Sequence, residues 1–451
     1  MSLDDLKRST RNQLRRLPGE GRVVINAYRQ LVLLRRIANT KLRVLLNKDA
    51  PHPETIYWID PKRIVFHTNY QRRGNSLPPE DRVFDMHRDK GKVYGGPWDI
   101  SDFRFDDLEV VRALRARIDD GVEWRTTEFF SKMRGDLERH GSASWRVRSV
   151  ADLDDRCQYL DRLIESIRRN GFKLSHEVQL PGEDKGVAAH PHFGSEIAVN
   201  IGRDGHYLFQ DGRHRLAIAR ILGIPQIPVK VLVRHAQWVE FRQFMRSLAR
   251  SGGASSRTNE LYQNPIHPDL QDIPAAHGCE DRFNAIRKAA IPNGGTFLDI
   301  GANLGYFCHR FEDLGYSCFA VEVLPQIALA ADRIRIAEGK NFMVIAEDLF
   351  SAVKTEPLRG RKFDVVLALS IFHHFLKTKE TFDKFAKWLG ELNADMMILE
   401  PHCADEPQMI GAYRNFHEQQ FVEFILERSV LKHSEIIHRC EDGRPIYRLW
   451  R

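Results

Sequence analysis

The sequence predicts an α/β protein of two domains, preceded by a basic helical segment over residues 1–50. Between residues 51 and 248 strand-like and helix-like patterns are mixed, which favours an α+β domain. From residue 261 to residue 451 short apolar runs alternate with longer helical patterns, as in a parallel sheet whose strands are joined by helices. The segment between them, 249–260, is small, polar and glycine-containing, which is typical of a linker.

The composition is that of an ordinary soluble protein. Of 451 residues, 42% are apolar and 29% are charged, and the net charge of +7 indicates a mild preference for anionic partners. No uncharged apolar run reaches the roughly 18 residues of a membrane span, and the first residues lack a secretory signal, so we expect a cytoplasmic protein. The six cysteines show no C-x-x-C spacing, so we expect reduced thiols and no metal site.

The basic segment has a helical pattern over residues 21–48, where apolar residues recur at helical spacing with Arg and Lys between them. A basic amphipathic helix can lie against an anionic membrane, which here would be a peripheral contact with the inner membrane surface. The alternative is that the helix packs against its own chain or a second subunit.

In the first domain an apolar strand leads into Asp211 and Gly212, and a helix begins at once with Arg213, His214 and Arg215. Cationic side chains at this end oppose the helix dipole unless an anion binds there. These five residues are therefore candidates for binding phosphate or a nucleotide. Asp211 is either the helix N-cap or a metal or base contributor, and the arginines can instead pair with local carboxylates.

The order of elements around this turn resembles the ParB/sulfiredoxin superfamily. A helix ends at Gly171, two strands flank the turn at Asp204 and Gly205, and "DGRHRLAIA" leads to a closing strand, "IPVKVLV". The resemblance covers residues 155–235 and implies a nucleotide ligand, ATP or CTP with Mg²⁺. Members of this superfamily include nucleotide-hydrolysing partition proteins, sulfiredoxins that activate a sulfinic acid with ATP, and a small-molecule kinase, so the domain is expected to be a kinase, a nucleotide hydrolase or only a binder. Glu177, His190 and His192 lie in the segment where a catalytic acid or base is expected.

The second domain contains a strand–turn–helix–strand unit. A strand over 297–300 enters the turn that begins at Gly301, a helix follows over 306–314, and a second strand over 318–321 ends at Glu322. An acid at that place suits a ribose diol. The turn reads D-x-G-x-N-x-G and lacks the third glycine of a pyrophosphate site. Asp299 would repel a pyrophosphate but could hold a cationic methionine end.

This unit resembles motif I of the class I S-adenosylmethionine-dependent methyltransferases, and later segments fit that family over residues 258–451. The resemblance implies a Rossmann-like sheet and S-adenosylmethionine as methyl donor. "VIAEDLF" places Asp348 where the family contacts the adenine, and "KFDVVLALSIFHHF" resembles the fourth strand and its catalytic loop. The cofactor-binding candidates are Asp299, Gly301, Asn303, Gly305, Glu322, Asp348 and Ser370.

Residues at the carboxyl ends of strands face the crevice of such a sheet, which nominates the catalytic candidates His373, His374 and Glu400, with His402 beside them. A His or Glu there can take a proton from a hydroxyl acceptor, whereas a phosphate acceptor needs only positioning. "LSIFHHF" and the tail "EDGRPIYRLWR" resemble bacterial enzymes that cap O-antigen polysaccharide by methylation.

The sequence therefore favours a small-molecule or glycan acceptor, such as a phosphorylated glycan or a cell-surface precursor in polysaccharide biosynthesis. In that hypothesis the ParB-like domain binds or phosphorylates the acceptor that the second domain methylates. One alternative is a nucleic-acid methyltransferase with the ParB-like domain as its targeting module, which the absence of an N-P-P-Y or D-P-P-Y run disfavours. The other is a non-catalytic, nucleotide-gated binding protein.

Overall fold

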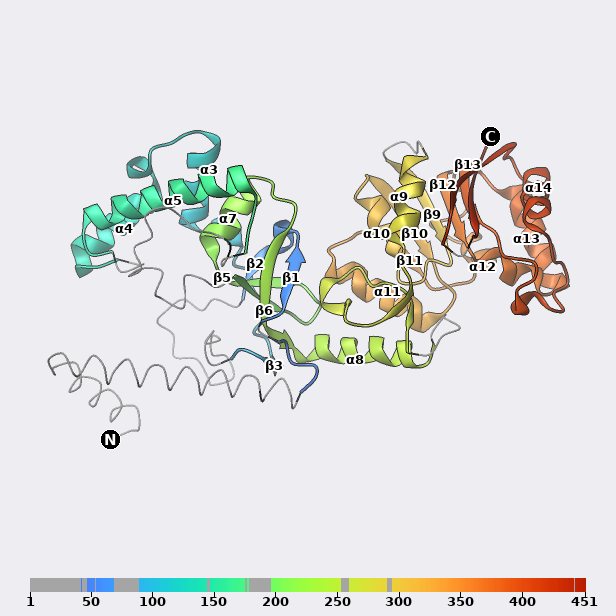
Figure 1. Cartoon of the computed structure of the whole chain (residues 1–451), viewed down its shortest axis with the longest axis horizontal. Coiled ribbons are helices and arrows are strands. Elements are labelled where there is room, and N and C mark those ends of the chain that lie inside the picture. Colours follow the sequence, from blue (N-terminus) through green and yellow to red (C-terminus); the bar gives the residue numbers. More distant parts are fainter. Residues whose placement is uncertain are drawn as a thin grey trace. The chain divides into compact units, whose positions relative to one another are not determined.

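The computed structural model describes residues 42, 47–52, 54–68, 89–143, 147–174, 177, 196–252, 259–289, 294–441 and 443–451. The chain divides into two compact units, Met1–Val239 (unit 1) and Glu240–Arg451 (unit 2), shown in Figure 1. The division falls inside helix α8 (Ala236–Arg250). The predicted linker begins at the end of this helix and lies partly outside the described residues, as does nearly all of the predicted basic helix over residues 21–48.

Unit 1 contains a six-stranded mixed sheet in the order β1-β6-β4-β5-β2, with β3 also pairing with β6. Its strands are β1 (Ile56–Ile59), β2 (Phe66–His67), β3 (Lys92–Tyr94), β4 (Ile197–Ile201), β5 (Tyr207–Asp211) and β6 (Ile227–His235). β4 pairs antiparallel with β5 and parallel with β6. The central strands are almost wholly buried, as their continuous apolar sequences predict.

The helices of unit 1 include α3 (Glu109–Asp119), α4 (Glu128–His140), α5 (Val150–Asn170) and α7 (Arg213–Ile221), with short 3₁₀ turns η1 (Pro61–Arg63), η3 (Phe105–Asp107) and η4 (Trp124–Thr126). α3 and α5 both contact α7. Ser149 caps α5 by accepting the Asp152 N–H, and Gly171 ends the helix, as its sequence predicts. The predicted helix, two strands, helix and closing strand are all confirmed as elements.

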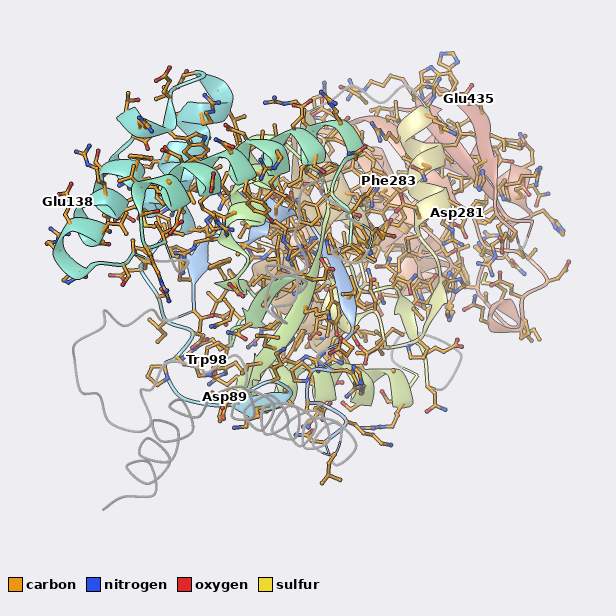
Figure 2. All side chains as sticks on the ribbon, turned by 60° about the vertical axis from the view of Figure 1, so that its left-hand side comes forward. Asp89, Trp98, Glu138, Asp281, Phe283 and Glu435 are labelled. Atoms are coloured by element: carbon orange, nitrogen blue, oxygen red, sulfur yellow. The ribbon has the colours of Figure 1, made fainter. Side chains whose placement is uncertain are left out.

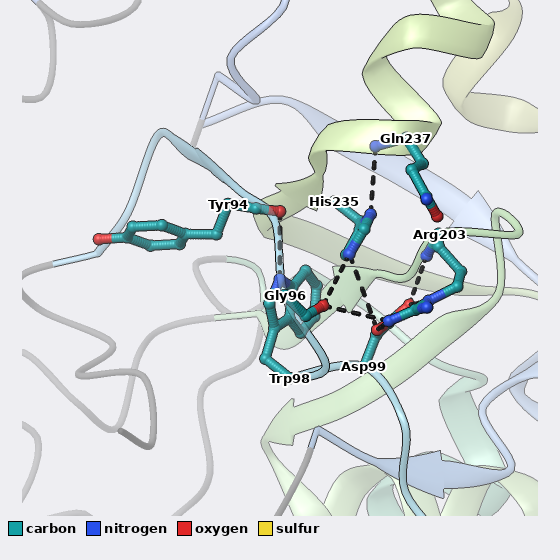
Figure 3. Close-up of polar contacts among 7 residues, drawn as sticks. All are labelled: Tyr94, Gly96, Trp98, Asp99, Arg203, His235 and Gln237. Atoms are coloured by element: carbon teal, nitrogen blue, oxygen red, sulfur yellow. Dashed lines mark hydrogen bonds and ion pairs between the residues drawn. The ribbon is translucent and has the colours of Figure 1, made fainter. Parts of the chain in front are cut away.

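A polar cluster fixes the junction between β6 and α8 (Figure 3). His235 Nδ1 accepts the backbone N–H of Gln237 at 3.1 Å, so Nε2 carries the hydrogen and donates to the Gly96 carbonyl at 2.9 Å. Arg203 pairs with the buried Asp99 at 2.7 Å and also donates to the Gly96 carbonyl. The side chains of Asp99 and His235 are 4% and 3% exposed, and these bonds hold the start of α8 against the sheet.

Unit 2 contains a seven-stranded sheet in the order β11-β10-β9-β12-β13-β15-β14. The strands are β9 (Gly295–Ile300), β10 (Tyr316–Val321), β11 (Met343–Ile345), β12 (Phe363–Leu369), β13 (Ala394–Glu400), β14 (His433–Arg439) and β15 (Pro445–Trp450). The first five are parallel, whereas β15 runs antiparallel to both of its neighbours. A small parallel pair, β7 (Leu261–Gln263) and β8 (Ala275–His277), precedes the sheet.

Helices cover both faces of the unit 2 sheet, which confirms the predicted doubly wound α/β architecture. They are α9 (Glu280–Lys288), α10 (Tyr306–Glu312), α11 (Pro325–Ala337), α12 (Leu349–Ala352), α13 (Lys379–Glu391) and α14 (Glu418–Arg428), with turns η7 (Pro268–Leu270), η8 (Phe372–Leu376) and η9 (Pro407–Met409). Alternate residues of a strand enter two separate cores: Phe297 packs with α9 and α10, whereas Leu298 packs with α12, α13 and α14. Figure 2 labels Asp281 and Phe283 on α9 and Glu435 on β14.

In the described part of the chain, no helix combines the length and the apolar character needed to cross a bilayer. The same residues contain no group of three His, Cys, Asp or Glu side chains suited to a metal ion. All six cysteines are described, and none forms a disulfide.

Candidate functional site

The candidate site of unit 2 lies where the strand order reverses. From β9 the chain continues to β10 on one side, and only later does it return to β12 on the other side. In open parallel sheets, ligands bind at such a switch point, outside the carboxyl ends of the strands. The carboxyl ends of these strands therefore meet at one edge, as the sequence predicted: Gly301, Glu322 and Ser370 follow β9, β10 and β12, and Glu400 ends β13.

The turn after β9 brings the backbone close to its surroundings. Gly301 has φ of 71°, and a Cβ atom there would lie 2.6 Å from Ile371 Cδ1, so only glycine fits. The N–H groups of Gly301 and Ala302 both donate to the Val321 carbonyl, at 2.9 and 3.1 Å. Gly305 follows at the N-cap of α10 with φ of 77°. The turn is thus tied to the end of β10.

The Glu322 side chain forms a second connection between the turn after β9 and the end of β10. The N–H of Asn303 donates to its Oε2 at 2.9 Å, and the N–H of Leu324 donates to its Oε1 at 3.0 Å. Its side chain is buried, and burial raises the pKa of this carboxyl although the backbone donors oppose that shift. Each oxygen keeps a further lone pair, so the carboxylate can still accept from a ribose hydroxyl.

Asp299 is a second buried acid, in β9 two residues before Gly301. Burial, and then the nearby Glu322 carboxylate, raise the pKa of Asp299 to about 8. The thiol of Cys308 lies 4.0 Å from its Oδ2. Asp299 therefore keeps a proton near neutral pH, and an incoming cation would favour its ionised form.

The end of β12 is joined to the end of β13 by side-chain bonds. Ser370, which has φ of 51°, donates its hydroxyl to Glu400 Oε1 at 2.7 Å. Arg444 donates to the Ser370 hydroxyl at 3.1 Å, and Arg282 lies 3.4 Å from Glu400 Oε2. Burial lowers the pKa of Arg282, but the charges of Glu400, Cys440 and Tyr262 and a hydrogen bond to Cys440 together raise it more, so the pKa is raised overall. The buried Glu400 is thus held between a hydroxyl and two guanidinium groups.

Sequence reasoning did not identify Arg282 and Arg444. Arg282 comes from α9, which precedes the whole parallel sheet. Arg444 lies directly before β15, and because β15 runs antiparallel to β13, its first residues lie beside the carboxyl end of β13. A prediction of that reversed strand would have placed Arg444 at the site.

Three histidines gather beyond the ends of β12 and β13. The rings of His373 and His374 lie 4.0 Å apart between centroids, and His373 is buried whereas His374 is exposed. Burial, then the neighbouring His374 and Lys377, lower the pKa of His373 to about 3. His402 is buried and its Nε2 lies 3.2 Å from Asn415 Oδ1. These imidazoles are therefore neutral at physiological pH and can accept protons.

Asp348 is exposed at the start of α12. Its Oδ1 accepts the N–H groups of Phe350 and Ser351, at 3.0 and 3.2 Å. A hydrogen bond from the Ser351 side chain, together with these backbone bonds, lowers the pKa of its carboxyl. It is therefore the N-cap of α12. The predicted contact of Asp348 with adenine stays a prediction.

In unit 1 the predicted cationic residues begin α7. Asp211 ends β5, and the N-cap is Gly212, with φ of 91°, so the N-cap role considered for Asp211 is wrong. A Cβ atom on Gly212 would lie 3.1 Å from Ile197 Cα, and this close contact and the positive φ together favour glycine there. Arg215 lies 3.5 Å from the buried Glu196, so it does have a local carboxylate partner.

Arg213 helps to lower the pKa of two histidines near this turn. Burial, then Arg213 and Arg156, lower the pKa of His214 well below its usual value. Burial, then Arg213, also lower the pKa of His67 to about 4. Arg156 comes from α5 and was not identified from the sequence. Glu177 accepts the N–H of Leu174 at 2.9 Å, whereas His190 and His192 lie outside the described residues.

A sequence profile for the family described as "Methyltransferase domain" matches residues 275–432, so unit 2 carries a methyltransferase domain. Among solved structures, monomeric WbdD is 20% identical, with a TM-score of 0.35 over 43% of this chain and 47% of its own. Magnesium protoporphyrin IX methyltransferase (ChlM) from Synechocystis PCC 6803 is 14% identical, with a TM-score of 0.31 over 47% of this chain and 97% of its own. The match thus spans less than half of WbdD. No curated protein sequence matches the chain.

Proposed function

We propose that unit 2 transfers a methyl group from S-adenosylmethionine to a hydroxyl or phosphate oxygen of a small-molecule or glycan acceptor. The observation that carries this proposal is the buried Glu322, held by the N–H groups of Asn303 and Leu324 at the switch point of the sheet. It is a carboxylate with unused lone pairs beside a glycine turn, which suits the ribose diol of the donor. The methyltransferase domain over residues 275–432 supports S-adenosylmethionine as the cofactor.

Different residues at the site would bind different parts of the donor. Asp299 would face the cationic methionine end, and Gly301, Asn303 and Gly305 would let the donor approach the backbone. Asp348 would contact the adenine, and Ser370, fixed by Glu400 and Arg444, would close the site. When bound, the donor supplies an electrophilic methyl group, and the protein orients the acceptor in line with it and excludes water.

The acceptor would bind beyond the ends of β12 and β13, where His373, His374 and Glu400 lie. A neutral imidazole there can remove a proton from a hydroxyl group as the methyl group is transferred. The geometry favours a supporting role for Glu400, because its oxygens already meet Ser370, Arg282 and Arg444. A glycan or a phosphorylated glycan of the cell surface fits the resemblance of the loop that contains His373.

For unit 1 the proposal is a phosphate or nucleotide site at the start of α7. Arg213, His214 and Arg215 begin the helix after Gly212, and Arg156 lies close enough to influence His214. Backbone N–H groups at a helix start and nearby guanidinium groups together suit a phosphate. The ligand would be ATP or CTP with Mg²⁺, and unit 1 would then bind or phosphorylate the acceptor that unit 2 methylates.

Calorimetric titration of the full chain with S-adenosylmethionine tests the proposal for unit 2. Saturable binding that Glu322→Ala weakens by more than about tenfold would support it, because the variant removes the acceptor of a charge-assisted hydrogen bond. Glu347→Ala, a change at an exposed acid of the same unit, is the control. Absence of binding to the folded wild-type protein would refute the proposal.

Titration with ATP and then CTP, each with Mg²⁺, tests the proposal for unit 1. We expect the double variant Arg213→Ala/Arg215→Ala to lose nucleotide binding and to keep donor binding. Loss of both would mean that the variant disturbs the whole fold, which circular dichroism would reveal. Nucleotide binding that survives in the folded variant would contradict the site.

A further inference from the structure

Asn415 fixes which nitrogen of His402 carries a hydrogen. The Asn415 side chain donates from Nδ2 to the Ala404 carbonyl at 2.8 Å, which turns its Oδ1 towards His402 Nε2, 3.2 Å away. An amide oxygen only accepts, so His402 Nε2 is the protonated nitrogen of the ring. The lone pair of the imidazole is therefore on Nδ1.

His402 Nδ1 is buried and meets no hydrogen-bond donor within the described part of the chain. The whole side chain is only 4% exposed. Burial lowers the pKa of His402, the bond to Asn415 and the charge of Glu406 raise it, and Arg444 lowers it, with a lower value overall. A buried lone pair without a donor is unfavourable, so Nδ1 is a position that a donor group would fill.

His373, in the turn η8 that follows the neighbouring strand β12, shows the same feature. His373 Nδ1 is also buried without a hydrogen-bond partner among the described residues, and His373 is 7% exposed. The pairing of Leu369 with Glu400 brings the ends of β12 and β13 together, and His402 is close enough to influence the pKa of His373. Two neutral imidazoles thus place, at the same edge of the sheet, ring nitrogens that meet no hydrogen-bond partner among the described residues.

We propose that His402 Nδ1 takes the proton of an acceptor hydroxyl group, and that Asn415 is the positioning residue that holds this tautomer. This inference rests on the proposed methyltransferase function and narrows its acceptor class to an alcohol or phenol. The acceptor oxygen forms a bond to the methyl carbon, the bond from that carbon to sulfur breaks, and its electron pair stays on sulfur. The hydroxyl proton moves to His402 Nδ1 and then to solvent.

The same arrangement disfavours a phosphate acceptor. A fully ionised phosphate oxygen has no proton to give, and the two neutral imidazoles and the Glu406 carboxylate add no positive charge. Arg444, the cation that lowers the pKa of His402, is already 3.0 Å from Glu406. Lys377 influences His373 and His374, but both effects on the pKa are secondary to burial.

The first test measures the tautomer. Nitrogen NMR of histidine-labelled protein, with the His402 signal assigned by its loss in His402→Gln, should show Nε2 protonated at neutral pH. In Asn415→Asp the carboxylate should raise the pKa of His402 by about one unit or more, because an opposite charge favours the imidazolium. Protonation of Nδ1 in the wild-type protein would overturn the proposal.

The second test measures methyl transfer from S-adenosylmethionine to glycerol and phenol as hydroxyl probes and to inorganic phosphate as the competing probe. His402→Gln should lower kcat by about 10²–10⁴-fold, the usual effect of a general base. Because the base works deprotonated, activity is lost as pH falls through the pKa of His402, and Asn415→Asp should move that loss to higher pH. His433→Gln, at an exposed histidine of β14, is the matched control.

The outcomes separate this inference from the function on which it rests. Failure of the wild-type protein to bind S-adenosylmethionine would refute the methyltransferase proposal itself. Donor binding with methylation of phosphate alone, or with hydroxyl methylation that His402→Gln leaves intact, would overturn only the role of His402. Should no probe be methylated, the tautomer measurement decides, and an NMR titration of His402 that Asn415→Asp leaves unmoved counts against the positioning role.

Discussion

Two turns of this protein both place a left-handed glycine at a helix N-cap, and they differ in charge. In unit 1, β5 passes through Gly212, with φ of 91°, into α7, and in unit 2 the turn after β9 reaches α10 through Gly305, with φ of 77°. Arg213 and Arg215 begin α7, whereas the acids Asp299 and Glu322 flank the turn of unit 2. A glycine N-cap after a strand is thus surrounded by cations in one unit and by acids in the other.

The comparison shows that side chains decide what such a turn can bind. The start of a helix favours an anion through its backbone N–H groups. In unit 2 the N–H of Asn303, within the turn, is already taken by Glu322, so the turn offers oxygen acceptors instead. In unit 1 the N-cap of α7 has no side-chain hydrogen bond, and the cations add to the field of the helix start. One turn therefore suits a cation or a diol, and the other suits a phosphate.

The largest expected effect comes from breaking the turn of unit 2 with Gly301→Val. The new Cβ would lie 2.6 Å from Ile371 Cδ1, so the turn must shift and donor binding should fall below detection. Overpacking and the positive φ should together lower the free energy of unfolding by about 2–5 kcal/mol. Calorimetry with S-adenosylmethionine and thermal unfolding would measure the two effects.

Gly339→Val is the matched control for this substitution. Gly339 has φ of 64°, but nothing lies within 4 Å of the added Cβ position, so only the backbone strain is shared. This variant should lose about 1–3 kcal/mol of stability and keep donor binding. If both variants bind the donor equally well, the close contact between Gly301 and Ile371 is unimportant for the site.

The second expected effect is a dependence of donor affinity on pH. The pKa of Asp299 is raised to about 8, and a bound cation would lower it, so donor binding should release a proton. Affinity should then increase with pH, by at most about tenfold per unit below pH ~8, and level off above it. Asp299→Asn should abolish this dependence. Calorimetry in two buffers of different ionisation enthalpy would detect the proton, and equal apparent enthalpies would contradict the prediction.

At both turns the sequence predicted the strands and helices, but not the side chains that reach the turn from elsewhere in the chain. The strands and helices around both turns lie close to their predicted positions because each follows a local signal, an apolar run or a glycine. Arg156, Arg282 and Arg444 were missed because each reaches its turn from a distant element. The bond between His402 and Asn415 spans 13 residues of an irregular connection. Such contacts depend on how elements pack, which periodicity does not encode.

Arg156→Ala tests whether Arg156 contributes to nucleotide binding at the cationic turn of unit 1. If Arg156 belongs to the cationic turn, its loss should weaken ATP or CTP binding by about tenfold, the value of one charge-assisted hydrogen bond. Donor binding in unit 2 should not change. Arg168→Ala, at an exposed position of the same helix, is the control. Because Arg156 also covers the ring of Tyr159 at 4.8 Å, thermal unfolding must show that the variant stays folded.

The smallest expected effect separates two roles of one acid. Asp348 caps α12, so Asp348→Ala should lower the free energy of unfolding by about 1 kcal/mol. Asp348→Asn keeps an oxygen for Phe350 and Ser351 and should leave stability nearly unchanged. If the other oxygen of Asp348 also binds the adenine amino group, Asp348→Asn should still weaken donor affinity by a few-fold, since a neutral amide replaces a charged acceptor. Equal donor affinity in Asp348→Asn and the wild-type protein would mean that Asp348 serves only as the N-cap of α12. The acids that distinguish the turn of unit 2 from that of unit 1 would then be Asp299 and Glu322.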